Sequence, residues 1–367
     1  MSLIFPLIIA VLYLLCVSLI SQFSIVSGYK LIYPYLLLIF EIPICVIYLS
    51  SYYVKREYDI YDILNVLIIV GVMQAIIAII CFFVPSIKDV VVNNFLAKQF
   101  SDYFTQDIIF YLSQLRLNGL SSGMTFTMPV VQALIGMISL YLAINRNLKY
   151  LIPVPLLVFS AIINARNAIV VLTYGIILII IMLTKKKKTQ IRLLITAALT
   201  VILVLFMMHI MNNQSNLVSQ WILDGLNETF SFFQGEKVQV GYYDTLMSNF
   251  IIFPEGLSLF FGTGKSIFGL DIGLGSDIGY INDIWLGGLL FISIAYFAFL
   301  SYFIKAYNKG DKLIKFIVLL FISTFLIMNI KGTIVSNNGF INISVFLSMV
   351  FILNNSSNLS KAYVEKI

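Results

Sequence analysis

The chain has 367 residues, of which 60% are hydrophobic and only 11% are charged, and its mean hydropathy is +0.99. Ordinary soluble domains carry about 25% charged residues, and a water-soluble fold of this length could not cover so much apolar surface. The formal net charge of +6 is therefore read as a signal of membrane orientation rather than of nucleic-acid binding. The composition excludes a soluble domain and predicts an all-α, polytopic transmembrane bundle, one integral membrane domain over residues 1–367.

A transmembrane helix needs about 20 consecutive apolar residues, and the chain offers about ten such runs. They cover residues 2–22, 31–52, 60–84, 124–145, 150–164, 167–184, 192–211, 281–304, 314–330 and 339–355. The fifth and sixth share one apolar stretch that Asn164-Ala165-Arg166-Asn167 interrupts. A single helix over 150–184 would be too long for the bilayer, so we predict a break there. The alternative is a long tilted helix followed by a re-entrant turn.

Basic residues predict the orientation of these spans. Fifteen of the 23 lysines and arginines fall in one set of short loops and in the C-terminal tail. The positive-inside rule makes that side cytoplasmic, which puts both termini on the cytoplasmic side. We expect the membrane to be a bacterial plasma (inner) membrane. The opposite side holds the long connections, 85–123 and 212–280, and a short loop near Lys331. Because long loops usually carry function, we expect the working face to be extracytoplasmic.

Two arginines are predicted to lie on that outer face, against the usual charge bias. Arg166 separates two apolar runs, and Arg116 precedes the span that begins near 124. A guanidinium stays charged and offers a fork of donors that suits phosphate oxygens. The two side chains could therefore bind one pyrophosphate, with Lys331 as a third cationic contact. The alternative is that each arginine only anchors a helix end at the interface.

A glycine-rich stretch, Gly262-Thr263-Gly264-Lys265, leads through Asp277 and Tyr280 into the eighth span. It resembles the end of a nucleotide-binding loop, but the full GxxxxGK[ST] pattern fails and no strand precedes it. Lys265 could instead contact an anionic substrate. The Asp277 carboxylate could act as a general base toward a sugar hydroxyl, or it could only cap the following helix. One histidine and three cysteines within apolar runs predict neither a metal site nor a cofactor.

Three segments together resemble the O-antigen and capsular repeat-unit polymerases of the Wzy type, which are relatives of the O-antigen ligases. They are Arg116-Leu117-Asn118-Gly119 ahead of a span with Pro129, the arginine turn Ile163–Asn167, and the stretch from Gly262 to Tyr280 that opens a span containing Gly287-Gly288. The resemblance implies a GT-C-like architecture and a metal-independent, inverting glycosyl transfer on undecaprenyl-pyrophosphate-linked glycans. It implies catalytic roles for Asp277 and Arg166. Substrate-binding roles fall to Arg116, Arg166, Lys265, Tyr280 and Lys331.

The expected partners are the lipid-linked glycan, membrane lipid, a chain-length regulator and a flippase, and nucleic acid is not expected. The main rival reading is that the chain is itself a lipid-linked oligosaccharide flippase or another transporter. Transporters usually carry paired internal repeats, and the two halves of this sequence do not repeat. A membrane-bound acyltransferase and a non-enzymatic assembly partner are further alternatives.

Overall fold

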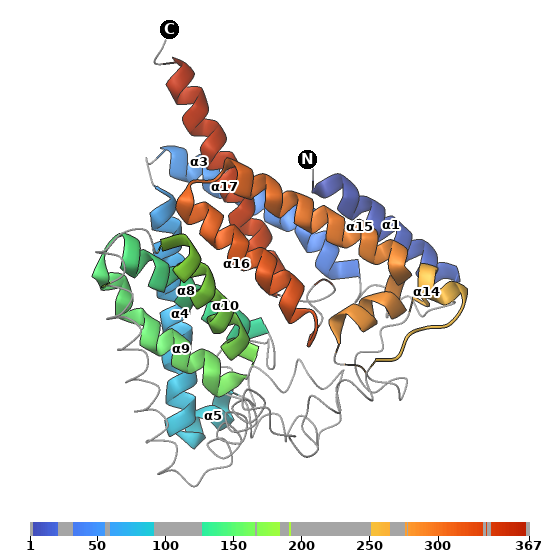
Figure 1. Cartoon of the computed structure of the whole chain (residues 1–367), viewed down its shortest axis with the longest axis horizontal. Helices are drawn as coiled ribbons and strands as arrows, with labels where there is room; N and C mark the ends of the chain where they lie inside the picture. Colours follow the sequence, from blue (N-terminus) through green and yellow to red (C-terminus); the bar gives the residue numbers. More distant parts are fainter. Residues whose placement is uncertain are drawn as a thin grey trace. The chain divides into compact units, whose positions relative to one another are not determined.

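The structure is a computed structural model of the whole chain (Figure 1). It describes residues 3–20, 32–55, 59–91, 127–165, 167–183, 191, 251–264, 276, 278–332, 335 and 339–364. All the regular structure within these ranges is helical. The described residues group into two compact units, one formed by 1–62 and 242–367 and the other by 63–241.

The first unit contains the N-terminal and C-terminal helices. These are α1 (Ile4–Ile20), a helix over 32–55 that includes η1 (Leu37–Glu41) and α3 (Ile42–Lys55), α14 (Leu257–Phe261), α15 (Gly279–Lys309), α16 (Lys312–Met328) and α17 (Gly339–Val364). Helix α15 contacts α1, α14, α16 and α17, and Figure 1 shows α1 running alongside it. Helix α15 is therefore the element around which this unit is built.

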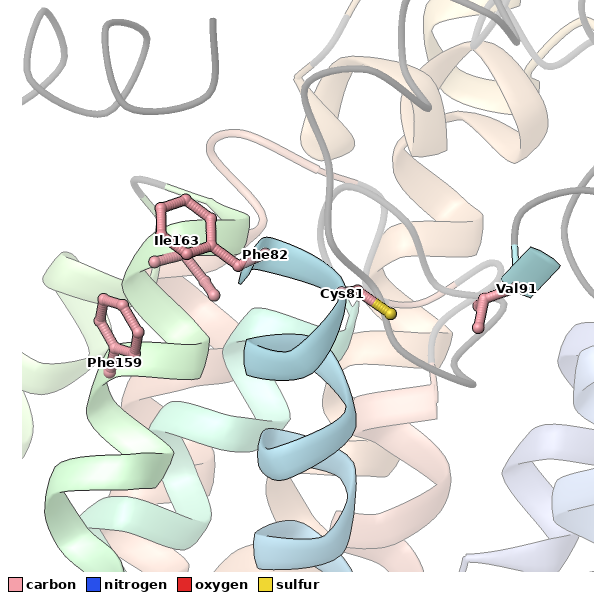
Figure 2. Close-up of a cluster of buried hydrophobic side chains, with 5 residues drawn as sticks. All are labelled: Cys81, Phe82, Val91, Phe159 and Ile163. Carbon is pink, nitrogen blue, oxygen red and sulfur yellow. The ribbon is translucent and has the colours of Figure 1, made fainter. Parts of the chain in front are cut away.

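The second unit is formed by most of α4 and by the helices up to 183. These are α4 (Ile60–Phe83), α5 (Pro85–Val91), α8 (Thr127–Asn145), η3 (Leu148–Leu151), α9 (Pro153–Asn164) and α10 (Asn167–Leu183). Helix α8 contacts α9, α10 and η3, and it is buried along almost its whole length. A separate apolar cluster joins α4, α5 and α9, and Figure 2 shows Phe82 of α4 beside Phe159 and Ile163 of α9.

Within the described part of the chain, four helices are long and apolar enough to cross a membrane, namely Ile32–Tyr52, Ile60–Phe83, Thr127–Asn145 and Gly279–Lys309. Several shorter helices are also apolar. On α4 large apolar side chains face outward, among them Val66, Ile69, Val70, Met73, Ile76 and Ile80. Polar side chains such as Gln132, Asn164 and Asp283 are buried. Apolar groups outside and polar groups inside are what a lipid solvent requires, so the chain is a helical membrane protein.

The predicted interruption between the fifth and sixth apolar runs is confirmed. Helix α9 ends at Asn164, Ala165 has extended backbone angles, and α10 begins at Asn167. The Asn164 side chain is fully buried and donates to the carbonyl oxygen of Ser160 at 2.8 Å. The run at 192–211 and most of the predicted outer loops lie outside the described residues. The number of spans and their orientation stay predictions.

The helix over 32–55 contains one wide turn. Pro43 has no N–H to donate within the helix, and its ring crowds the carbonyl of Ile39, four residues back. The turn before it is accordingly a π-turn over Leu37–Glu41, and the N–H of Ile42 donates to the carbonyl of Leu37, five residues back. Glu41, the last residue of this turn, is exposed.

Candidate functional site

Helix α15 is broken near its N-terminal end. The sequence predicts that this end lies on the outer face of the membrane. Its 31 residues would form a straight rod about 46 Å long, well beyond the ~30 Å of bilayer hydrocarbon. At Gly288 the backbone has φ 68° and ψ −174°, which ends a short helix over 279–287 and starts a new one. The part over 289–309 rises about 31 Å as a helix, which alone matches the hydrocarbon thickness. Figure 1 shows the short part set at a sharp angle near α14.

The glycine-rich segment 262–264 holds the break in place. The backbone N–H groups of Thr263 and Gly264 donate to the carbonyls of Trp285 and Leu286 at 2.7 and 3.0 Å, and the Thr263 hydroxyl also donates to Trp285 at 2.9 Å. These carbonyls lose their helical partners at the break, and membrane depth offers no water to replace them. A Cβ on Gly262 would collide with the backbone of Gly287. The segment that resembles a nucleotide-binding loop is thus a backbone support for a broken helix.

A fully buried carboxylate, Asp283, lies in the short helix. Its Oδ2 accepts a hydrogen bond from the Tyr296 hydroxyl at 2.8 Å and a longer one from the Asn329 amide at 3.4 Å. The Asn329 amide also donates to the Tyr296 hydroxyl oxygen. Asp283 and Tyr296 are 13 residues apart, about 20 Å along a straight helix. Their contact therefore requires the short helix to fold back against the long one.

Aromatic rings surround this carboxylate. The Tyr296 ring lies 5.6 Å from that of Tyr280 and 5.0 Å from that of Phe325, measured between centroids. On the helix over 32–55, the fully buried Tyr35 packs edge-on against Phe291 at 6.0 Å. The Tyr35 hydroxyl is close enough to Asp283 for the two groups to interact electrostatically.

Asp283 keeps one oxygen without a hydrogen-bond partner. Its Oδ1 accepts no hydrogen bond from any described residue. The Tyr35 hydroxyl likewise has no hydrogen-bond partner among them. Among the described residues no lysine or arginine forms an ion pair with Asp283. One carboxylate oxygen is thus fixed by two donors, while the other can accept a proton or bind a cation.

Two of the residues predicted from sequence lie at this end of α15 and α16. The Tyr280 hydroxyl donates to the carbonyl of Leu326 at 2.7 Å, and its N–H donates to the carbonyl of Asn329 at 3.2 Å. Lys331 lies two residues after Asn329 and is half-buried. Its backbone N–H donates to the carbonyl of Met328 at 3.1 Å. Because the Tyr280 hydroxyl is engaged, its ring is the part left for a substrate contact.

The other predicted site residues, Arg116, Arg166, Lys265 and Asp277, lie outside the described residues. Their roles stay predictions. The sequence pattern did not single out Asp283. The available signal was its place just inside an apolar run that begins at 281, since a carboxylate at membrane depth is costly and is usually retained for function.

No family model matches the chain, and no curated protein and no solved structure matches it.

Proposed function

We propose that the chain polymerises undecaprenyl-pyrophosphate-linked oligosaccharide repeat units into O-antigen or capsular polysaccharide. The transfer takes place on the extracytoplasmic face of the bacterial plasma membrane, by inverting glycosyl transfer. The observation that carries the proposal is the gathering of Tyr280, Lys331 and the buried Asp283 at one end of α15 and α16. The charge pattern of the sequence puts this end on the outer face, where lipid-linked repeat units are joined.

The chemistry needs a leaving-group site and a base. An acceptor hydroxyl oxygen bonds to the anomeric carbon of the donor glycan, and the bond from that carbon to the pyrophosphate oxygen breaks with inversion. The pyrophosphate takes the electron pair, and Arg116 and Arg166 stabilise its charge. Asp277 takes the acceptor proton. Lys265 and Lys331 hold the anionic donor, and the Tyr280 ring packs on a sugar.

Proteoliposomes with purified variants test this proposal. Undecaprenyl-pyrophosphate-linked repeat units are supplied, and the products are separated by length. Arg166→Ala should reduce the rate of lengthening by about 10²–10³-fold, as expected when a donor to a developing anion is lost. Arg146→Ala is the matched control, because that exposed arginine is predicted to be cytoplasmic, and it should keep the wild-type rate. Equal rates for the two folded variants would contradict the role of Arg166.

The break in α15 favours one second candidate, a flippase for lipid-linked oligosaccharide. Discontinuous transmembrane helices form the substrate sites of many transporters, close to the bilayer midplane. Here the break leaves a full-length helical part over 289–309, which puts the short helix toward one end of the span rather than at its middle. Transbilayer movement of the lipid without lengthening would favour this candidate over the polymerase.

A further inference from the structure

The surroundings of Asp283 concentrate negative charge in a dry part of the protein. The carboxylate is completely buried and has no ion-pair partner among the described residues. It lies about one turn before Gly288, where the short helix ends. The C-terminal end of a helix carries a partial negative charge, which adds to that of the carboxylate. A buried negative group in this position requires a compensating positive charge.

A neutral oxygen atom accompanies the carboxylate. Asp283 Oδ1 and the Tyr35 hydroxyl both lack hydrogen-bond partners among the described residues, and each is fully buried. Phe291 supports the Tyr35 ring just beyond the break. Two rigid oxygens with unused lone pairs, one of them charged, form the start of a cation-binding site rather than of an anion-binding one.

We infer that Asp283 anchors a monovalent-cation site at the end of the short helix of α15, with the Tyr35 hydroxyl as a second oxygen ligand. The cation is Na⁺ or a proton. In the described residues no three histidine, cysteine, aspartate or glutamate side chains lie close enough together to hold a metal ion, and Ca²⁺ sites draw on several carboxylates. A single carboxylate balances one positive charge. The site goes beyond polysaccharide synthesis and does not depend on it.

Few of the described groups could titrate together with Asp283. Within the described ranges, those in electrostatic range are the hydroxyls of Tyr280 and Tyr296 on α15 itself and of Tyr35 on the helix over 32–55. From α16 the facing group is the neutral amide of Asn329. Among the described residues of α1, α14 and α17, no acidic or basic side chain contacts the carboxylate. Asp283 is therefore the one carboxylate among these described groups, and its substitution isolates its share of any response of the fold to cations.

The test is the thermal unfolding midpoint of the purified chain in detergent, measured in NaCl and in choline chloride at equal ionic strength and across pH 5–9. If Na⁺ is the ligand, NaCl raises the midpoint of the wild type by several degrees at fixed pH. If a proton is the ligand, the midpoint falls as the pH rises, because the folded chain then holds a proton that the unfolded chain releases. Either response should disappear in Asp283→Asn, and the exposed Asp89→Asn should keep it.

The same responses in wild type and Asp283→Asn, or no response to either cation in the wild type, would overturn the inference. Should Asp283→Asn fail to fold, Tyr35→Phe gives the decision because it keeps the carboxylate. It should shift the Na⁺ concentration or the pH at half effect by at least threefold in ion activity. An unchanged half-effect point in Tyr35→Phe would rule out the assigned ligand pair.

Discussion

Asp283, Tyr296 and Asn329 form a buried polar cluster. At the scale of single residues, the hydrogen bond from Tyr296 to Asp283 is the contact on which this polar cluster depends most. A buried carboxylate that loses a donor keeps the full cost of its lost hydration, so removing one partner is more damaging than a surface change. The second donor, Asn329, is farther from the carboxylate, at 3.4 Å against 2.8 Å. It cannot replace the hydroxyl.

Tyr296→Phe should therefore lower the free energy of unfolding by about 1–3 kcal/mol, the cost of leaving a buried polar group without its partner. The measurement is the thermal midpoint of the purified protein in detergent. Tyr302→Phe is the matched control, since Tyr302 is buried on the same helix and its hydroxyl bonds to none of the described residues. A similar loss in both variants would mean that the hydroxyl of Tyr296 contributes nothing specific.

One lysine at the start of α16 and one just after its end allow a paired test of the proposed activity. Lys331→Gln should slow lengthening of lipid-linked repeat units about tenfold, because it removes one cationic contact to the donor and leaves the arginines in place. Lys312→Gln, at the exposed first residue of α16, should have no effect. The rate of product lengthening in proteoliposomes distinguishes them. An effect of Lys312→Gln equal to that of Lys331→Gln would point to a general loss of positive charge.

At the scale of elements, the break in α15 depends on close backbone contacts among three glycines. Gly288 has a positive φ, and a Cβ at that position would collide with the carbonyl of Phe260 and the nitrogen of Gly262. Gly262 in turn approaches Gly287 just as closely. Backbones can approach this closely only where side chains are absent, so the supporting segment and the broken helix require each other.

Gly288→Ala should destabilise the protein by more than 2 kcal/mol, because it combines a disfavoured φ with a backbone collision. Gly256 has a similar φ of 59°, but a Cβ there would meet open space. Gly256→Ala should therefore cost only about 1 kcal/mol. Gly136→Ala, within α8 and with ordinary contacts, should be neutral or stabilising. Yield of monodisperse protein and the thermal midpoint rank the three. A tolerated Gly288→Ala would show that the break is not fixed by this packing.

Sequence periodicity predicted some of these elements and missed others for physical reasons. The end of α9 at Asn164 could be predicted because polar residues interrupt an apolar run longer than the bilayer. The break in α15 could not, because the residues around it, 284–292, are apolar or glycine and glycine is common in transmembrane helices. Only the contact with residues 262–264 shows what Gly287 and Gly288 do. Tyr296 was unpredictable as a partner of Asp283 because an unbroken helix would keep them apart.

At the scale of the whole molecule, the predicted orientation determines on which side of the membrane the polar cluster around Asp283 lies. In a cysteine-free background, Ser336→Cys should react with a membrane-impermeant maleimide in intact cells, because the loop after α16 is predicted to be extracytoplasmic. Asn308→Cys, exposed near the other end of α15, should react only after permeabilisation. The native Cys16, Cys45 and Cys81 are replaced by alanine first. The reverse pattern would place the cluster on the cytoplasmic side.

The most direct measurement combines two readouts in the same proteoliposomes. Purified wild-type chain is reconstituted, undecaprenyl-pyrophosphate-linked repeat units are added, and both product length and transbilayer movement of the lipid are followed. A polymerase yields a ladder of products that differ by one repeat unit. Folded protein that moves the lipid across the bilayer, or leaves it in place, without producing any lengthened glycan would contradict the proposed function.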